Sequence, residues 1–229
     1  MIDELVIFGC SHSVLDWQKY LNSEIKCVCY AEGGSSNELI LKKLKKYLND
    51  NWDILQNKIL IIQFTYLHRK HVFFDLTGKD YKLHGGNSIK NNYEFSEEHN
   101  KIVADYYNKW LEYFYNGRYE FLNLLNELRL LKKIFELKKV KYIWYLWDDV
   151  ESNEILFNEK STNKIKIIND IFEELSFTKF DNEYVVSEFI KKHKWRNCDI
   201  SNTSDSHIAE IYKKEFVEII KTKINNLEK

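Results

Sequence analysis

Residues 5–13 read LVIFGCSHS, an unbroken apolar run that stops at a glycine and continues into four side chains capable of chemistry. A short apolar run without alternation is typical of a strand buried on both faces, as in a parallel sheet covered by helices. The glycine predicts the end of that strand. The stretch therefore predicts an α/β fold and raises the question of what the residues CSHS do at the edge of its sheet.

Further apolar stretches along the chain have the composition of strands. They are EIKCVCYA at 24–31, KILIIQFT at 58–65 and VKYIWYLW at 140–147. After the first of them, Gly33 and Gly34 predict a turn, and Ser35 with Glu38 matches a capping box that would start a helix. The apolar residues expected on one face of that helix are Ile40, Leu44, Tyr47 and Leu48.

The rest of the chain also contains stretches with the patterns of helices and strands in turn. An irregular part at 66–96 precedes helical periodicity from Ser96 to Lys139, interrupted near Gly117. A helix around 163–175, a weaker strand near 177–186 and a helix from about Ser206 follow. Strands separated by helices predict a three-layer α/β/α sandwich with a mainly parallel, flavodoxin-like sheet of about five strands.

Charged residues balance almost completely, with 34 Lys and Arg against 35 Asp and Glu and a formal net charge of -1. A nearly neutral chain has no overall field that attracts nucleic acid or an anionic membrane, so neither is expected as a partner. No secretion signal or membrane-spanning run is recognisable. The expected location is the cytoplasm, and the sequence indicates no oligomeric state.

The four cysteines contain no CxxC pair, and Cys27 and Cys29 would share one face of a strand. This pattern is typical of small buried residues in a reducing compartment rather than of a disulfide framework. No local His, Asp and Glu spacing supports a metal site at His12 and His207. GGSSN lacks the patterns of nucleotide-binding loops, so no cofactor and no metal are expected.

Candidate chemistry gathers where the parallel strands would end, because ligands of open α/β sheets bind beyond the carboxyl ends of the strands. Acyl transfer needs a nucleophile, a base, a group that orients the base, and donors for the oxyanion. Ser11, His207 and Asp205 can fill the first three roles. The backbone N–H groups of Ser11 and Gly34, with a polar side chain from residues 63–65, can form the oxyanion hole.

Taken singly, these residues also have ordinary structural explanations. Ser11 suits a turn, Asp205 suits a helix N-cap, and His207 suits the first turn of a helix. Arg69 follows the third strand and could hold an anionic group of a substrate, or could serve structure alone. What favours function is the joint occurrence of these pieces, each at an expected strand end or helix start.

Four stretches resemble the sequence blocks of the SGNH (GDSL-like) hydrolases. GCSHS at 9–13 is similar to the first block, where serine follows a Gly-Asp or Gly-Cys pair, and AEGGSSNELI at 31–40 resembles the glycine turn of the second. IIQFTYLHR at 61–69 resembles the third block in one branch of the family, and SDSHIAEIYKK at 204–214 resembles the last. Their order and spacing match, and together they bracket nearly the whole chain.

The resemblance implies one hydrolase domain over 1–229 with an inserted region at about 66–139, and a catalytic triad of Ser11, Asp205 and His207. It implies Gly34 as an oxyanion donor, whereas the usual third-block asparagine is missing. Thr65 or Gln63 stands near its place. The Asp and His are separated by one residue instead of two, and Ile208 replaces the proline that often follows.

The activity that this resemblance implies is hydrolysis of a carboxylic ester, an O-acetyl group on a carbohydrate, through an acyl-enzyme on Ser11. The substrate would be a small-molecule or glycan ester. An O-acyltransferase could use the same triad on a glycan acceptor. A third reading is a catalytically impaired domain that keeps the fold for binding, since the third-block asparagine is absent.

Overall fold

A computed structural model gives the architecture of the chain. It describes residues 4–10, 21, 26–65, 67, 69–74, 79–83, 97–147, 169–181, 183–193 and 212–228.

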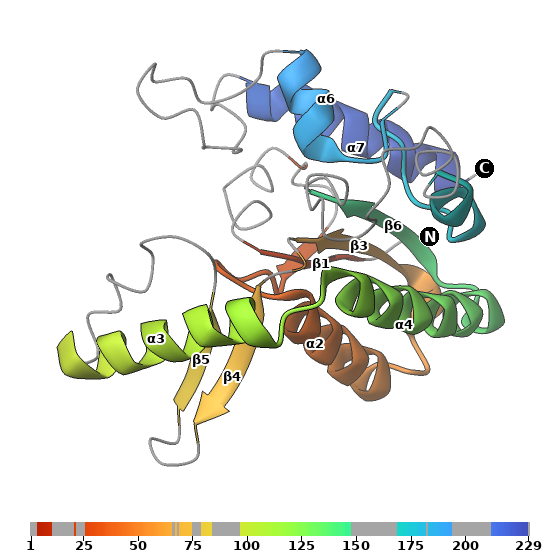
Figure 1. Ribbon diagram of the computed structural model, residues 1–229. Coiled ribbons are helices and arrows are strands. Elements are labelled where there is room, and N and C mark those ends of the chain that lie inside the picture. Colours follow the sequence, from red (N-terminus) through yellow and green to blue (C-terminus); the bar gives the residue numbers. More distant parts are fainter. Residues whose placement is uncertain are drawn as a thin grey trace.

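The centre of the fold is a four-stranded, entirely parallel sheet with the strand order β2-β1-β3-β6 (Figure 1). Its strands are β1 (Glu4–Phe8), β2 (Lys26–Cys29), β3 (Lys58–Phe64) and β6 (Lys141–Leu146). The predicted α/β class and parallel sheet are confirmed. Every residue of β1 is buried, as expected for an apolar run covered on both faces.

The fifth strand predicted near 177–186 is not formed as a strand among the residues described there, 177–181 and 183–186. Phe180 and Glu183 form an isolated bridge with each other, and Val185 forms a parallel bridge with Leu146 of β6. The N–H of Thr178 also donates to the carbonyl of Trp144 over 2.9 Å. The segment therefore follows the outer edge of β6 and contributes isolated bonds instead of a regular ladder.

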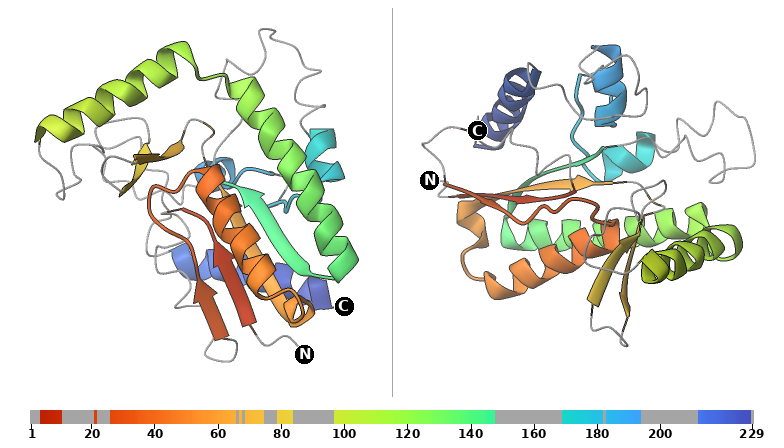
Figure 2. Two further views of the ribbon diagram at one scale, coloured as in Figure 1. Left: turned by 90° about the horizontal axis from the view of Figure 1, so that it is seen from below. Right: turned by 90° about the vertical axis from the view of Figure 1, so that its left-hand side faces the viewer.

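Helices cover both faces of the sheet, which gives three layers (Figure 2). On one face, α2 (Asn37–Asp50) and α4 (Gly117–Lys138) pack with alternate strand residues such as Phe8, Phe64 and Trp144. On the other, α6 (Val186–Lys192) and α7 (Lys213–Glu228) pack with the intervening set, which includes Ile7, Ile61 and Tyr145. This alternation follows from the two-residue period of a strand.

Helix α2 follows the predicted glycine turn, and the residues expected on its buried face are all buried. The predicted cap at Ser35 is wrong. Ser36 is the N-cap, and its hydroxyl accepts from the N–H of Leu39. The Ser35 hydroxyl instead donates to the carbonyl of Glu32 over 2.7 Å. This bond closes the turn that precedes the cap.

The region expected to be irregular contains an antiparallel hairpin of β4 (Lys70–Phe74) and β5 (Lys79–Leu83). The helical prediction that follows is confirmed, with α3 (Glu97–Tyr113) ending just before the break near Gly117 where α4 begins. Figure 1 shows the hairpin and α3 on the α2 side of the sheet, beyond its edge. A short 3₁₀ helix, η2 (Leu55–Asn57), leads into β3. Of the helix expected around 163–175, residues 169–174 are described and helical.

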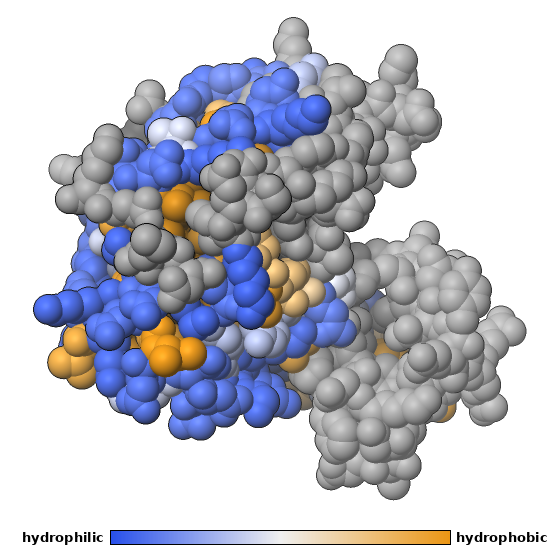
Figure 3. Space-filling view, turned by 180° about the vertical axis from the view of Figure 1, so that it is seen from behind, coloured by the Kyte–Doolittle hydropathy of each residue, from blue (hydrophilic) through white to orange (hydrophobic). Residues whose placement is uncertain are grey.

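The cysteine prediction holds only in part. Cys10 is completely buried, but Cys27 is half-buried and Cys29 exposed, because β2 lies at the edge of the sheet. None of the three forms a disulfide within the described part of the chain. Within the described part of the chain no helix could cross a membrane. The face seen in Figure 3 is mainly hydrophilic, with small, separate hydrophobic areas among its coloured residues.

Candidate functional site

The predicted triad of Ser11, Asp205 and His207 lies outside the described residues. The structure does describe the end of the sheet where these residues would act, which is formed by the carboxyl ends of the parallel strands and is called the sheet edge below. That end of the sheet includes three further predicted site residues, Gly34, Gln63 and Thr65.

The ends of β1 and β2 stay paired beyond the strands themselves. The N–H of Tyr30 donates to the carbonyl of Ile7 over 2.8 Å, and the N–H of Glu32 donates to the carbonyl of Gly9 over 3.1 Å. The loop that carries Gly34 therefore runs beside the residues that immediately precede Ser11. Gly34 itself has a φ of 74°, a conformation that glycine adopts at little steric cost.

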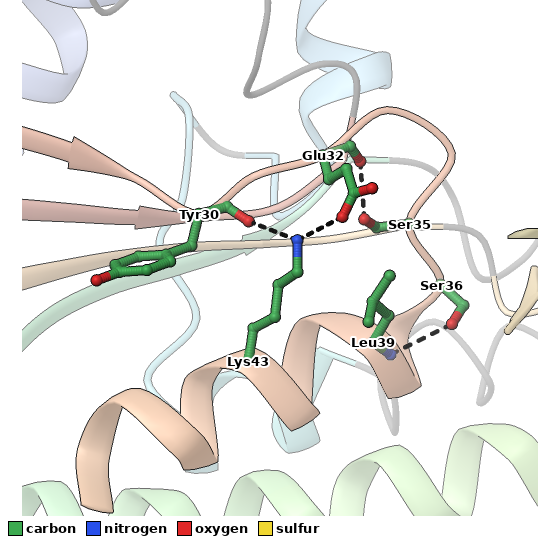
Figure 4. Close-up of polar contacts among 6 residues, drawn as sticks. All are labelled: Tyr30, Glu32, Ser35, Ser36, Leu39 and Lys43. Carbon is green, nitrogen blue, oxygen red and sulfur yellow. Dashed lines mark hydrogen bonds and ion pairs between the residues drawn. The ribbon is translucent and has the colours of Figure 1, made fainter. Parts of the chain in front are cut away.

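Lys43 of α2 ties this loop to the helix (Figure 4). Its ammonium group donates to the carbonyl of Tyr30 over 3.1 Å and to the carboxylate of Glu32 over 2.6 Å. The Ser35 hydroxyl and the Ser36 cap fix the remaining turn before the helix starts. Residues 30–36 are thus held at both ends, with Gly34 at the centre of the turn.

Gln63 is a fully buried polar residue near the end of β3. Its side-chain amide donates to Sγ of Cys10 over 3.1 Å. A buried amide in an otherwise apolar strand is costly unless it is bonded, so this contact fixes the end of β1 against β3. The contact also confirms that the Cys10 side chain packs inside the protein.

Thr65, the residue after β3, is held by the side chain of Asn37. The Thr65 N–H donates to Oδ1 of Asn37 over 2.8 Å, and Nδ2 of Asn37 donates to the Thr65 carbonyl over 3.0 Å. The Thr65 hydroxyl is buried and has no hydrogen-bond partner among the described residues. Such an orphaned hydroxyl typically costs about 1–3 kcal/mol, so it needs a functional or structural reason.

Sequence reasoning missed Asn37. The residue is 9% exposed and is the first residue of α2. Its position in GGSSN, directly after the two serines, was a usable signal, because a third polar residue there exceeds what one helix cap requires.

Arg69 lines a cleft of about 770 Å³ between α2 and α4. Trp110 of α3 and Asn37 also line this cleft, so Asn37 borders both the cleft and the sheet edge. The volume is within the range of small-molecule sites.

Charges in the cleft are largely paired with one another. Lys70 binds Glu38 over 2.6 Å, and Lys45 binds Glu127 over 2.7 Å. Burial raises the pKa of the Glu120 carboxyl; nearby Lys70 opposes this shift, and Glu38 adds to it. This arrangement gives the cleft a polar surface of mixed charge rather than a strong field of one sign.

No cluster of His, Cys, Asp and Glu suited to a metal ion occurs among the residues that the structure describes. A scan against protein-family models and a search of the curated proteins found no match for this chain.

Proposed function

We propose that this protein is a cytoplasmic serine esterase of the SGNH type, which hydrolyses an O-acetyl or similar carboxylic ester on a carbohydrate. Ser11 is the nucleophile, His207 the base and Asp205 the residue that orients the base. No cofactor, metal or nucleic acid takes part. The choice of ester and of carbohydrate rests on the resemblance of the sequence to that family.

One observation carries the proposal: three of the four resembling blocks meet directly at the residues before Ser11. Glu32 of the second block bonds to Gly9 over 3.1 Å, and Gln63 of the third block bonds to Cys10 over 3.1 Å. Because β2 and β3 both pair in parallel with β1, the sheet brings these three blocks together beyond the carboxyl ends of its strands. Their contact at one edge supports a shared site there.

The proposed reaction has two steps. Nε2 of His207 takes the proton of the Ser11 hydroxyl as Oγ attacks the ester carbonyl, and the same nitrogen returns the proton to the leaving alcohol. Water then attacks the acyl-enzyme with His207 again as base, which releases the acid and restores Ser11. The N–H groups of Ser11 and Gly34 donate to the oxyanion in both steps.

Hydrolysis of p-nitrophenyl acetate tests this mechanism. Ser11→Ala is expected to lower kcat by at least about 1,000-fold, whereas the neighbouring Ser13→Ala retains the wild-type rate. A Ser11→Ala protein that keeps full activity would exclude Ser11 as the nucleophile.

The cleft beside Asn37 favours a second candidate, an O-acyltransferase with the same triad. A transferase needs room for an acceptor, and a cleft of about 770 Å³ that borders the edge provides it. Product analysis with and without a carbohydrate acceptor separates the two reactions. Acetylated acceptor in place of free acetate would identify the transferase.

A further inference from the structure

Asn37 makes an unusual pair of bonds for a residue in the first turn of a helix. Its amide oxygen accepts from the N–H of Thr65 over 2.8 Å, and its amide nitrogen donates to the carbonyl of the same residue over 3.0 Å. The side chain thus pairs with Thr65 as a neighbouring strand would. Because Asn37 is almost completely buried, water does not compete for these bonds.

This pairing leaves one polar group of Thr65 unused. Both backbone groups are bonded to Asn37, while the buried hydroxyl has no partner among the described residues. The other candidate donor from β3, the amide of Gln63, is already committed to Cys10 and to the carbonyl of Phe64. Of the two, Thr65 therefore keeps a donor for a ligand.

We infer that Thr65 supplies the side-chain donor of the oxyanion hole in the proposed esterase, and that Asn37 is the positioning residue that holds it there. The inference rests on the proposed function. It gives Thr65 the role for which the usual third-block asparagine is missing. The stiff χ1 of a β-branched side chain ties the position of its oxygen to the backbone, so two bonds from Asn37 to the Thr65 backbone fix where the hydroxyl oxygen lies, while its proton stays free to turn toward an acceptor.

Kinetics of Thr65→Val, Thr65→Ser, Asn37→Ala and the Asn37→Ala/Thr65→Val double variant test this inference. Thr65→Val keeps the shape and both backbone bonds, so kcat is expected to fall by about 100-fold with little change in KM. Thr65→Ser, which restores the hydroxyl, recovers most of that loss. Asn37→Ala lowers kcat by about tenfold through misplacement of the donor.

The double variant separates positioning from a general structural effect. If Asn37 acts through the Thr65 hydroxyl, its replacement adds nothing to the loss in Thr65→Val. Additive losses in kcat would overturn the role of Asn37, and a Thr65→Val enzyme within about threefold of wild type would overturn the role of Thr65. If Asn37→Ala does not fold, Thr65→Val and Thr65→Ser still decide whether the Thr65 hydroxyl is the donor.

Ser11→Ala in the same assay distinguishes failure of the inference about Thr65 from failure of the proposed function. An inactive Ser11→Ala enzyme beside a fully active Thr65→Val enzyme rejects only the role of Thr65. A fully active Ser11→Ala enzyme rejects the esterase mechanism and this inference with it.

Discussion

The side-chain amide of Gln63 donates a hydrogen bond to Sγ of Cys10 over 3.1 Å, and both residues are fully buried. The bond joins two neighbouring strands where they leave the sheet. Because Cys10 directly precedes Ser11 in the chain, this bond holds the backbone next to the proposed nucleophile. A nucleophile on the next residue would benefit from this fixed backbone.

Gly34→Ala tests the turn that would supply the second oxyanion donor. Gly34 has a φ of 74°, where alanine is strained, so the variant is expected to lose about 1 kcal/mol of stability. It is also expected to lose activity beyond what this destabilisation explains, because the N–H of residue 34 moves. The control is Gly33→Ala, since Gly33 is not among the glycines with positive φ in the described residues. Equal kcat values for the two variants would count against Gly34 as a donor.

Lys43→Met tests whether the tether of the Gly34 loop matters for activity. The Lys43 and Glu32 side chains are partly exposed, so loss of the ion pair should cost less than about 1 kcal/mol of stability. The loop loses both bonds from Lys43, and kcat is expected to fall several-fold at an unchanged melting temperature. Lys46→Met removes an ion pair with Asp50 on the same helix and serves as the control. Identical kinetics for both variants would show that the tether has no role in turnover.

Glu4 predicts a measurable pH dependence of stability. Burial acts to raise the pKa of this carboxyl, but hydrogen bonds from Lys26 and Lys58 outweigh it and lower the pKa below the ordinary value of 4.5. Because the unfolded carboxyl takes up its proton at higher pH than the folded one, this stabilisation is present above pH 4.5 and is lost as pH falls through the lower folded pKa.

Glu4→Gln is therefore expected to lower the free energy of unfolding by about 1 kcal/mol at pH 7. The difference from wild type should shrink as the pH falls below 4.5 in urea titrations. A difference that stays constant down to pH 3 would mean that these ion pairs do not stabilise the fold.

Trp144→Phe tests the packing of β6 against the segment around Leu175. The indole of Trp144 is fully buried, and its N–H donates to the carbonyl of Leu175 over 2.9 Å. Loss of ring volume and of this bond should cost about 2–4 kcal/mol in urea unfolding. Trp52→Phe, with its side chain 39% exposed, should cost less than about 1 kcal/mol. Comparable losses would contradict the assignment of Trp144 to the core.

The sequence predicted the sheet well because its central strands are marked by composition alone. LVIFG and KILIIQF are short, apolar, β-rich runs typical of a strand buried on both faces, and both form central strands. The hairpin of β4 and β5 was missed, because a two-stranded pair draws its stability from what it packs against more than from its own pattern. The choice of Ser36 over Ser35 as the cap was likewise hidden, since adjacent serines have the same propensity.

At the site, residue types were easier to predict than contacts. Gly34, Gln63 and Thr65 were identified as belonging to one edge from the order of strands, and the structure places them there. The clamp from Asn37 to Thr65 was not predicted, because nothing in a single sequence states which buried amide meets which backbone group. Arg69 was predicted from its place after the third strand, whereas the cleft that it lines also depends on the α4 helix, which is remote in sequence.

Labelling with a fluorophosphonate probe tests the central claim most directly, because the reagent reacts with an activated serine without requiring the natural substrate. Folded wild-type protein is expected to carry one adduct, which peptide mass spectrometry assigns to Ser11. The adduct should be absent from Ser11→Ala and present in Ser13→Ala. A folded wild-type protein that takes no label at Ser11 would contradict the esterase mechanism and would favour a domain that keeps this fold for binding.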